Sequence, residues 1–284
     1  MIPQYISNII EQSLNSPVDT VRSVHGGDIN QAAKLTIADG RVFFVKWNAQ
    51  SPDSMFETES KGLQLLASAG TALQVPKVFI QDEGFLVLEW IDEGTAKQNT
   101  AYNFGVELAK LHKNSTKYFG LDHNNFIGKL HQSNSAHSNW ADFFAIERIE
   151  PQIKMGVESG TLTRSLLNDV QKLYAKLGAI FPNEPPALLH GDLWSGNYMF
   201  TKSGGTSIYD PAAYYGHREM DLAMTQLFGG FPSDFYEGYN DQYPMQPGFD
   251  DRVTICNLYP ILVHANLFGG SYSRQAENII QRYA

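Results

Sequence analysis

Cysteine and long apolar runs are nearly missing from this 284-residue sequence. Cys256 is the single cysteine, so an internal disulfide is impossible, and its place in a mostly apolar helical pattern predicts a buried, unreactive thiol. No apolar run reaches the roughly 20 residues that a membrane-spanning helix requires, and the first ten residues lack the basic segment of a secretory signal. We therefore expect a cytoplasmic protein that is not embedded in a membrane.

Positive charge is also scarce. The chain has 21 Lys and Arg against 30 Asp and Glu, a net charge of −9, which argues against nucleic-acid binding through a basic face and against attraction to anionic membranes. Repeats and long low-complexity tracts are absent, and His131 and His137 in the one polar loop of note lack a metal-ligand set. The 43% of hydrophobic residues is ordinary for a globular protein with a sizeable core.

Two short acidic segments stand out in the second half of the chain. Residues 190–197 read His-Gly-Asp-Leu-Trp-Ser-Gly-Asn, and residues 208–211 read Ile-Tyr-Asp-Pro. The apolar residues 186–189 lead into the first segment from a buried strand, and residues 200–208 read as strand, Gly-Gly turn and strand. Such a hairpin would bring Asp210 back beside Asn197. Residues of these types are also common in ordinary loops and helix caps, and an isolated motif would favour that interpretation. The buried strand before the motif and the second carboxylate at hairpin distance favour a catalytic site instead.

The spacing of these segments matches the requirements of phosphoryl transfer from ATP. A carboxylate must orient and deprotonate the attacking hydroxyl, and an amide oxygen with a second carboxylate must hold magnesium on the phosphates. Asp192 and Asn197 have the five-residue offset of the kinase catalytic loop, and Asp210 follows as the second carboxylate. We predict Asp192 as the catalytic base and Asn197 and Asp210 as the Mg²⁺ ligands.

The first half of the chain supplies candidates for holding the nucleotide. Two strands around the Asp39-Gly40 turn end in Lys46, where a kinase places a cation against the α- and β-phosphates. A helical segment follows, and either Glu57 or Glu59 could pair with Lys46, since they differ by about half a helical turn. Gly26 and Gly27 precede a strand, whereas a Walker loop follows a strand and opens a helix, so this pair is not a Walker loop. It could still cover the phosphates of a nucleotide, as the glycine-rich loop of a kinase does.

A second strand pair, residues 75–80 and 85–91, leads into Asp92-Glu93-Gly94. Adenine would be read by backbone groups at this hinge, so we predict only the segment, Glu89, Trp90 and Ile91. Beyond it, His112 ends a helical pattern and reads as a structural histidine. Asp221, on a predicted helix, is expected to accept backbone N–H groups of the catalytic loop and to hold that loop in place.

Together these segments resemble the fructosamine kinase, or ketosamine-3-kinase, family, within the aminoglycoside-phosphotransferase-like branch of the kinase fold. The resemblance rests on residues 190–197, 208–212 and 215–219, and further matching stretches are residues 43–46, 55–59, 140–144, 227–232 and 247–250. Leu-Trp-Ser-Gly-Asn in the catalytic loop and Phe-Gly-Gly-Phe-Pro are specific to this family, whereas His-Gly-Asp alone indicates only the wider superfamily.

The resemblance implies a substrate. The acceptor would be the 3-hydroxyl of a ketosamine, the adduct of a sugar with an amine, free or on a protein lysine, and phosphorylation there labilises the adduct and so implies deglycation. The resemblance places His264 and Asn266 in the ketosamine pocket, and Trp194 could stack on the sugar or its amine substituent. It also favours Glu59 as the partner of Lys46. Many family members have a cysteine where this chain has Asp28, which argues against thiol-based regulation of that loop.

We therefore expect a two-lobe α+β fold of the protein-kinase type. Residues 1–89 would form a small lobe on an antiparallel sheet that binds ATP, and residues 90–284 a mostly helical lobe with the catalytic and substrate residues. A kinase for an aminoglycoside or amino alcohol is the alternative enzyme. A nucleotide-binding pseudokinase is the non-enzymatic alternative, which the complete set Lys46, Asp192, Asn197 and Asp210 opposes. The preferred sugar and the oligomeric state stay open.

Overall fold

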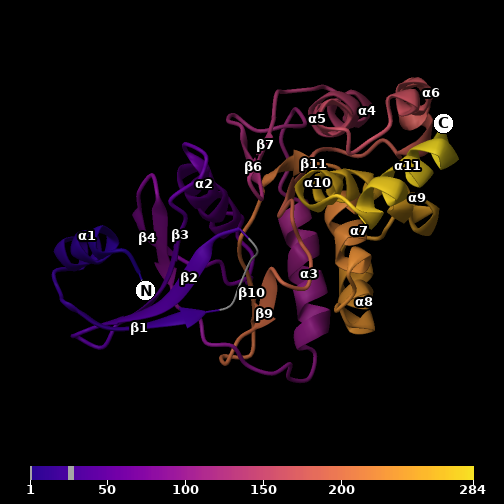
Figure 1. Ribbon diagram of the computed structural model, residues 1–284. Coiled ribbons are helices and arrows are strands. Elements are labelled where there is room, and N and C mark those ends of the chain that lie inside the picture. The colour runs from indigo at the N-terminus through magenta and orange to yellow at the C-terminus, as the bar shows by residue number, and fades with distance from the viewer. Residues whose placement is uncertain (1, 25–28) are drawn as a thin grey trace.

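The computed structural model describes residues 2–24 and 29–284 and divides them into two lobes (Figure 1). In the smaller lobe, five antiparallel strands pair in the order β1-β2-β3-β5-β4. Its elements, in chain order, are α1 (Gln4–Leu14), β1 (Val18–Val24), β2 (Gln31–Ile37), β3 (Val42–Trp47), α2 (Met55–Ala67), β4 (Val78–Gln81) and β5 (Phe85–Glu89).

Apolar side chains on both faces of this sheet explain why a helix packs on each side. Ile6 and Ile10 of α1 pack against one face of the sheet with the buried Leu35. On the other face, Phe56 and Leu63 of α2 form a second cluster with Leu86 and Leu88 of β5. The β2–β3 hairpin turns at Asp39-Gly40 as predicted, with Gly40 at a φ of 89°. The sheet is thus held rigidly against α2, the helix that carries Glu59.

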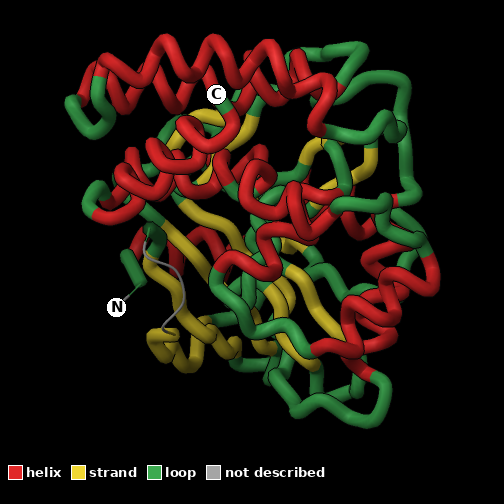
Figure 2. Tube along the Cα trace, turned by 90° about the vertical axis from the view of Figure 1, so that its right-hand side faces the viewer, coloured by secondary structure: helices red, strands yellow, loops and turns green. Residues whose placement is uncertain are grey.

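The larger lobe is mostly helical, as Figure 2 shows in a view turned by 90°. Three short antiparallel strand pairs, β6–β7, β8–β11 and β9–β10, are inserted among its helices. The elements are α3 (Thr100–His112), β6 (Asn125–Ile127), β7 (Leu130–Gln132), α4 (Trp140–Phe143), a π-helix (Phe144–Ile149), α5 (Glu150–Ser159), a 3₁₀ turn (Arg164–Leu166), α6 (Leu167–Ile180), β8 (Ala187–Leu189), β9 (Tyr198–Phe200), β10 (Thr206–Ile208), β11 (Tyr214–Gly216), α7 (Glu219–Leu227), α8 (Ser233–Gln242), α9 (Phe249–Cys256), α10 (Leu258–Phe268) and α11 (Ser271–Tyr283).

Two local predictions are confirmed in this lobe. The β9–β10 hairpin pairs Tyr198 with Ile208, so the residues after it return to the catalytic loop. Cys256 is fully buried on α9 and is a free thiol whose pKa burial raises well above its usual value. Among the described residues, no helix is both long and apolar enough to cross a membrane.

Candidate active site

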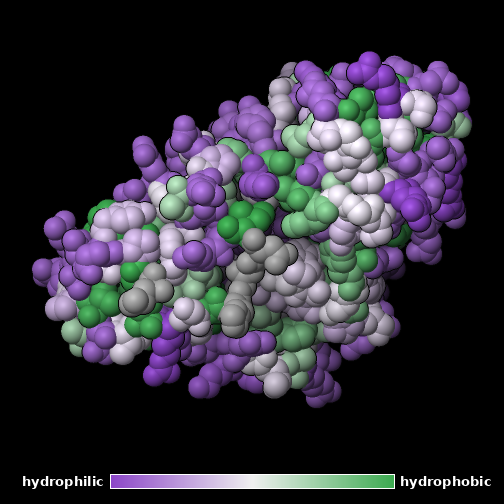
Figure 3. Space-filling model, viewed as in Figure 1, coloured by the Kyte–Doolittle hydropathy of each residue, from purple (hydrophilic) through white to green (hydrophobic). Residues whose placement is uncertain are grey.

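A cavity of about 640 Å³ lies between the two lobes, and hydrophobic side chains gather around the junction of the lobes (Figure 3). The small lobe contributes Val24, Ala32, Phe44, Lys46, Glu59 and Leu88, and the hinge contributes Glu89, Trp90, Ile91 and Glu93. The large lobe contributes Asn125, Phe126, Asp192, Trp194, Asn197, Asp210, Tyr259, His264 and Phe268, among others. The residues predicted for the nucleotide, the base and the metal therefore line one continuous space.

The catalytic loop enters this cavity directly from a buried strand. Ala187, Leu188 and Leu189 of β8 are almost fully inaccessible to solvent, and the chain then turns at Gly191 with a φ of 82°. A side chain at this position would collide with the Ala212 carbonyl, because its Cβ would lie 2.1 Å from that oxygen. Gly191 therefore lets the catalytic loop pass close to the segment that follows Asp210.

Asp221 holds the start of this loop, as predicted. One carboxylate oxygen accepts the His190 N–H at 2.7 Å and the other accepts the Gly191 N–H at 2.9 Å. His112 Nε2 lies 3.2 Å from the same carboxylate, and its Nδ1 lies 2.8 Å from the Tyr239 hydroxyl. Burial opposes ionisation of Asp221, but His112, His190 and the backbone N–H groups hold its pKa below the usual value. The buried carboxylate is thus an ionised support for the loop, and His112 is structural.

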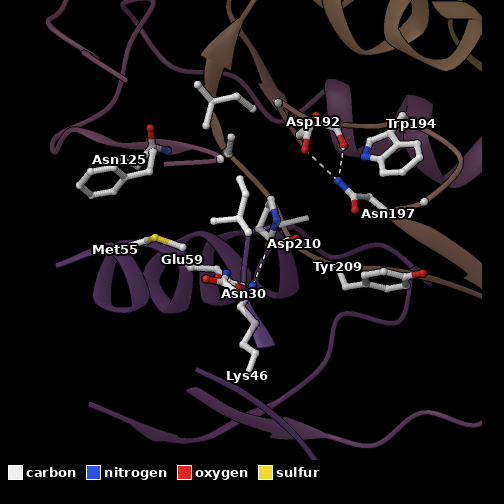
Figure 4. A pocket seen from close by; sticks show the side chains of 18 of the residues that line it. Asn30, Lys46, Met55, Glu59, Asn125, Asp192, Trp194, Asn197, Tyr209 and Asp210 are labelled. Carbon is white, nitrogen blue, oxygen red and sulfur yellow. Dashed lines mark hydrogen bonds and ion pairs between the residues drawn. The ribbon is translucent and has the colours of Figure 1, made fainter. Parts of the chain in front are cut away.

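Asp192 lies two residues after His190, and its carboxylate points toward the centre of the cavity (Figure 4). Asn197 Nδ2 donates to Asp192 Oδ2 at 2.9 Å and to the Asp192 carbonyl at 2.8 Å, which closes the loop on itself. Burial, with the negative charge of Asp210 nearby, raises the pKa of Asp192 to about 8. Such a carboxylate binds a proton more strongly than an ordinary aspartate, and its pKa lies near neutral pH, where proton transfer by an acid or base is most effective.

Lys46 joins the two lobes at the floor of the cavity (Figure 4). Its ammonium lies 2.5 Å from Glu59 and 2.7 Å from Asp210. Burial opposes its charge, but Asp210 and Glu59 raise the pKa of Lys46 above its usual value, so the group is cationic. Glu57 forms a separate surface pair with Lys61 at 2.7 Å. Residues two apart on a helix point about 200° apart, so only Glu59 of the two faces the lysine.

Asp210 is held in a conformation that few residues adopt. Its φ is 59°, in the left-handed region that Asp tolerates better than most side chains. The Tyr209 N–H donates to the Asn197 carbonyl at 3.1 Å, so the hairpin brings the two predicted metal ligands together. The Asp210 side chain is 51% exposed, because it faces the open cavity.

These oxygens fit a magnesium ion bound together with a nucleotide. The described residues contain no group of three or more His, Cys, Asp or Glu side chains that could hold a metal by themselves. Magnesium in phosphoryl-transfer enzymes is held by one or two protein oxygens and otherwise by phosphates and water. The Asp210 carboxylate and the Asn197 amide oxygen are a donor set of this kind.

The hinge residues lie at the edge of the same cavity. Glu89, Trp90 and Ile91 line it immediately after β5. In the described part of the chain, no hydrogen bond engages the backbone N–H or C=O of Ile91. Gly26 and Gly27, the predicted phosphate cover, and the neighbouring Asp28 lie outside the described residues.

Aromatic rings line the end of the cavity beyond Asp192. Trp194 is 36% exposed and meets Phe228 edge to face, with ring centroids 5.9 Å apart. Phe228 in turn packs against His264 at 5.2 Å, and His264 against Phe268 at 5.6 Å. His264 Nδ1 donates to the Pro260 carbonyl at 2.7 Å, which leaves Nε2 for a ligand.

Asn266 requires a correction, because it does not line the cavity. Its Nδ2 donates to the Gln152 carbonyl at 2.9 Å and to Gln152 Oε1 at 2.8 Å, and so ties α10 to α5. Since His264 and Asn266 are two residues apart on α10, their side chains point in different directions. The structure gives Asn266 a packing role in place of the pocket contact that we expected.

Sequence reasoning missed several lining residues at this end. Asn125, Phe126, Tyr259 and Phe268 were not predicted as lining residues. Asn125 and Phe126 follow a polar stretch that resembles any turn. A helix that presents aromatic residues on more than one side was the only signal for Tyr259 and Phe268, and it does not distinguish pocket from core.

Comparisons with known proteins extend over the whole chain. A family model described as fructosamine kinase matches residues 1–284. A protein named probable ketoamine kinase, from Synechocystis sp., is 39% identical over 286 residues, which cover 98% of this chain and 96% of that protein. The crystal structure of a putative fructosamine-3-kinase from Thermobifida fusca has a TM-score of 0.89 at 32% identity and covers 98% of both chains.

More distant structures share the fold alone. The streptomycin–ATP complex of the aminoglycoside phosphotransferase APH(2")-IIa has a TM-score of 0.68 at 15% identity, over 99% of this chain and 97% of that chain. The predicted two-lobe α+β fold of the protein-kinase type is therefore confirmed.

Proposed function

Because the chain belongs to the fructosamine kinase family, we propose that it transfers a phosphoryl group from ATP to the 3-hydroxyl of a ketosamine. The observation that carries the proposal is the position of Asp192, in one cavity, between a charged end at Lys46 and an aromatic end at His264. The charged end suits a nucleotide and its metal. The aromatic end suits a sugar adduct.

At the nucleotide end, the chain's own charges orient the phosphates. Lys46, kept cationic by its two carboxylate neighbours, would contact the α- and β-phosphates. Asn197 and Asp210 would hold magnesium, which when bound neutralises charge on the phosphates. Ile91 would offer its backbone groups to adenine. Glu59 fixes the lysine when Asp210 turns to the metal, because it keeps its own contact with Nζ.

At the centre, Asp192 would position and deprotonate the acceptor. Asn197 engages Oδ2 of the carboxylate, so Oδ1 stays available to accept a hydrogen bond from the 3-hydroxyl. As the acceptor oxygen bonds to the γ-phosphorus, the bond from that phosphorus to ADP breaks, and the hydroxyl proton passes to Asp192. The raised pKa of Asp192, about 8, makes this transfer more favourable than an ordinary aspartate would.

At the aromatic end, the lining selects against a polycation. Beyond Asp192 the wall is formed mainly by side chains without a carboxylate, namely Asn125, Phe126, Trp194, Tyr259, His264, Leu267 and Phe268 among the described residues. Asp221 also lines the cavity, but it is only 1% exposed and already accepts the His190 and Gly191 N–H groups. An aminoglycoside carries several ammonium groups that need acidic partners, whereas a sugar adduct needs ring faces and a few hydrogen bonds. This wall therefore favours a ketosamine over the alternative acceptor.

Phosphorylated ketosamines are labile, so the proposed biological role is deglycation. The acceptors would be small ketosamines or glycated lysine side chains of proteins, handled in the cytoplasm. The mouth of the pocket is open to solvent at Trp194 and Phe268, which are 36% and 54% exposed. A substrate attached to a larger molecule could therefore reach Asp192.

An assay of ATP consumption across acceptors tests the proposal. Adducts of fructose, ribulose and erythrulose with one amine would be compared, with kanamycin and choline as controls and Asp192→Asn as the inactive variant. We expect ADP formation with at least one ketosamine and with neither control. Turnover of kanamycin or choline, but of no ketosamine, would show that the acceptor is not a ketosamine. ATP binding without turnover of any acceptor would indicate a pseudokinase.

A further inference from the structure

A buried polar network lies behind the aromatic end of the cavity, and two of its members, Asn125 and Tyr259, also line that cavity. Its members are Asn125, Gln132, Asn134, Arg148 and Tyr259, none of them more than 4% exposed. Arg148 is fully buried, has no carboxylate partner among the described residues, and stacks on aromatic rings instead. Most buried polar groups in proteins are hydrogen-bonded, so the pattern of these bonds is informative.

The network ends on the backbone that follows Asp210. Gln132 Nε2 donates to the Ala212 carbonyl at 3.1 Å and to Asn125 Oδ1 at 2.8 Å. Asn125 Nδ2 donates to the Ala213 carbonyl at 2.8 Å. Two side chains of the β6–β7 hairpin thus fix the two carbonyls that lie two and three residues beyond Asp210.

The other side of the same segment is fixed by the catalytic loop. His190 Nε2 donates to the Tyr209 carbonyl at 3.0 Å, and the Ala212 N–H donates to the His190 carbonyl at 3.0 Å. A non-glycine residue at a φ of 59°, as Asp210 is, keeps that conformation only where its surroundings impose it. Bonds on both sides of Asp210 supply this constraint, and the amides of the β6–β7 hairpin provide those to the Ala212 and Ala213 carbonyls.

The same glutamine also reaches the acceptor wall. The Tyr259 hydroxyl donates to Gln132 Oε1 at 2.8 Å, and Tyr259 lines the cavity. Both amide hydrogens of Gln132 and its carbonyl oxygen are therefore in use. Arg148 supports the arrangement from behind by donating to Asn134 Oδ1 at 2.7 Å, and Asn134 Nδ2 donates to Asn125 Oδ1 at 3.0 Å.

From this geometry we infer that Gln132 is a positioning residue that couples the acceptor wall to the metal-binding turn. Its amide donors keep Asp210 in its strained conformation, and its carbonyl oxygen sets the place of Tyr259. The inference rests on the proposed function, because it assigns Asp210 to magnesium and Tyr259 to the acceptor. Loss of a group that positions a metal ligand typically lowers metal affinity by about 10- to 100-fold.

Two variants separate the hydrogen bonds that Gln132 donates from the one that it accepts. Gln132→Glu keeps the volume and an oxygen for the Tyr259 hydroxyl, but the ionised form loses both donors. Tyr259→Phe keeps the ring and removes only the bond to Oε1. We expect Gln132→Glu to weaken magnesium-dependent ATP binding by about tenfold or more, and Tyr259→Phe to leave ATP affinity unchanged and to raise the KM of the acceptor. Gln132→Met, which loses both the donated and the accepted hydrogen bonds, should show both effects.

Calorimetric titration of ATP with and without magnesium, melting temperatures, and steady-state kinetics provide the readouts. Thr225→Val is the matched control, because Thr225 is a fully buried donor on α7 outside the cavity lining, and its loss should change the melting temperature alone. If folded Gln132→Glu and Gln132→Met bind magnesium and ATP as the wild type does, Gln132 only supports the fold and the inference is wrong. Tyr259→Phe tests the bond between Tyr259 and Gln132 even where neither glutamine variant folds. Lack of turnover of every ketosamine by the wild type would refute the proposed function, while the binding titrations would still test Gln132.

Discussion

Replacing Asp221 by asparagine tests how the catalytic loop is held. The carboxylate accepts the N–H groups of His190 and Gly191 at 2.7 and 2.9 Å and contacts His112 at 3.2 Å, all in a buried site. An asparagine of the same size keeps one accepting oxygen, and its NH₂ group faces a backbone donor. Two charge-assisted bonds are weakened or lost, each worth about 1.5–3 kcal/mol.

The expected loss of unfolding free energy is therefore about 3–5 kcal/mol, as for other broken buried charge interactions. A chain of 284 residues has an unfolding entropy of about 0.6 kcal/mol/K. The melting temperature should accordingly fall by about 5–8 °C. Tyr239→Phe is the matched control, because it removes only the hydrogen bond between the Tyr239 hydroxyl and His112 and should cost only about 1 kcal/mol.

The pH dependence of this loss has a fixed sign. The pKa of Asp221 is lowered in the folded protein, so its stabilising contribution is complete above the ordinary aspartate pKa and disappears as the pH falls through the folded value. Calorimetric melting at several pH values would show a constant difference between wild type and Asp221→Asn from pH 6 to 8, and a smaller one below about pH 4. A variant that melts within 1 °C of the wild type at about pH 7, with unchanged kcat, would refute the role of Asp221 in holding the loop.

Five further substitutions, at Asp192, Asp210, Trp194, Glu59 and Glu57, have distinct expected outcomes. Asp192→Asn should abolish turnover and leave magnesium–ATP affinity largely in place, so an equal loss of both would contradict its role as base. Asp210→Ala should weaken ATP binding in the presence of magnesium, and normal calorimetric binding would make the ligand assignment wrong. Trp194→Ala should keep fold and ATP affinity but lose at least about tenfold in kcat/KM for ketosamine, or roughly 1.4 kcal/mol, and unchanged efficiency would make it a packing residue. Glu59→Gln should raise the KM of ATP because it frees Lys46, whereas Glu57→Gln should not, and equal effects would contradict the observed pairing.

The arrangement of the residues at the centre of the cavity could be predicted from the sequence because it is encoded locally. Asp192 and Asn197 lie in one loop, and a two-strand hairpin accounts for the return of the chain to Asp210. The position of Asp221 could also be predicted, since a buried acid on the next helix needs donors and the loop offers them. Short spacing and simple turn chemistry carry these inferences.

The acceptor wall could not be predicted in the same way. Gln132 meets Tyr259, which is 127 residues away, and nothing in either local sequence indicates the contact. Helix rotation decided other cases: Glu59 faces Lys46 and Glu57 does not, and Asn266 points to Gln152 while His264 faces the cavity. An error of two positions on a helix reverses such an assignment, and only packing determines which side is buried.

The position of the transferred phosphate tests the central claim most directly. The wild-type protein would be incubated with magnesium, ATP and a ketosamine of N-α-acetyl-lysine, and the product examined by phosphorus–proton correlated NMR. We predict a phosphate on the 3-oxygen of the sugar with the wild type and no product with Asp192→Asn. A phosphate on another oxygen, or no phosphorylated adduct of any ketosamine from a protein that binds magnesium and ATP, would contradict the account.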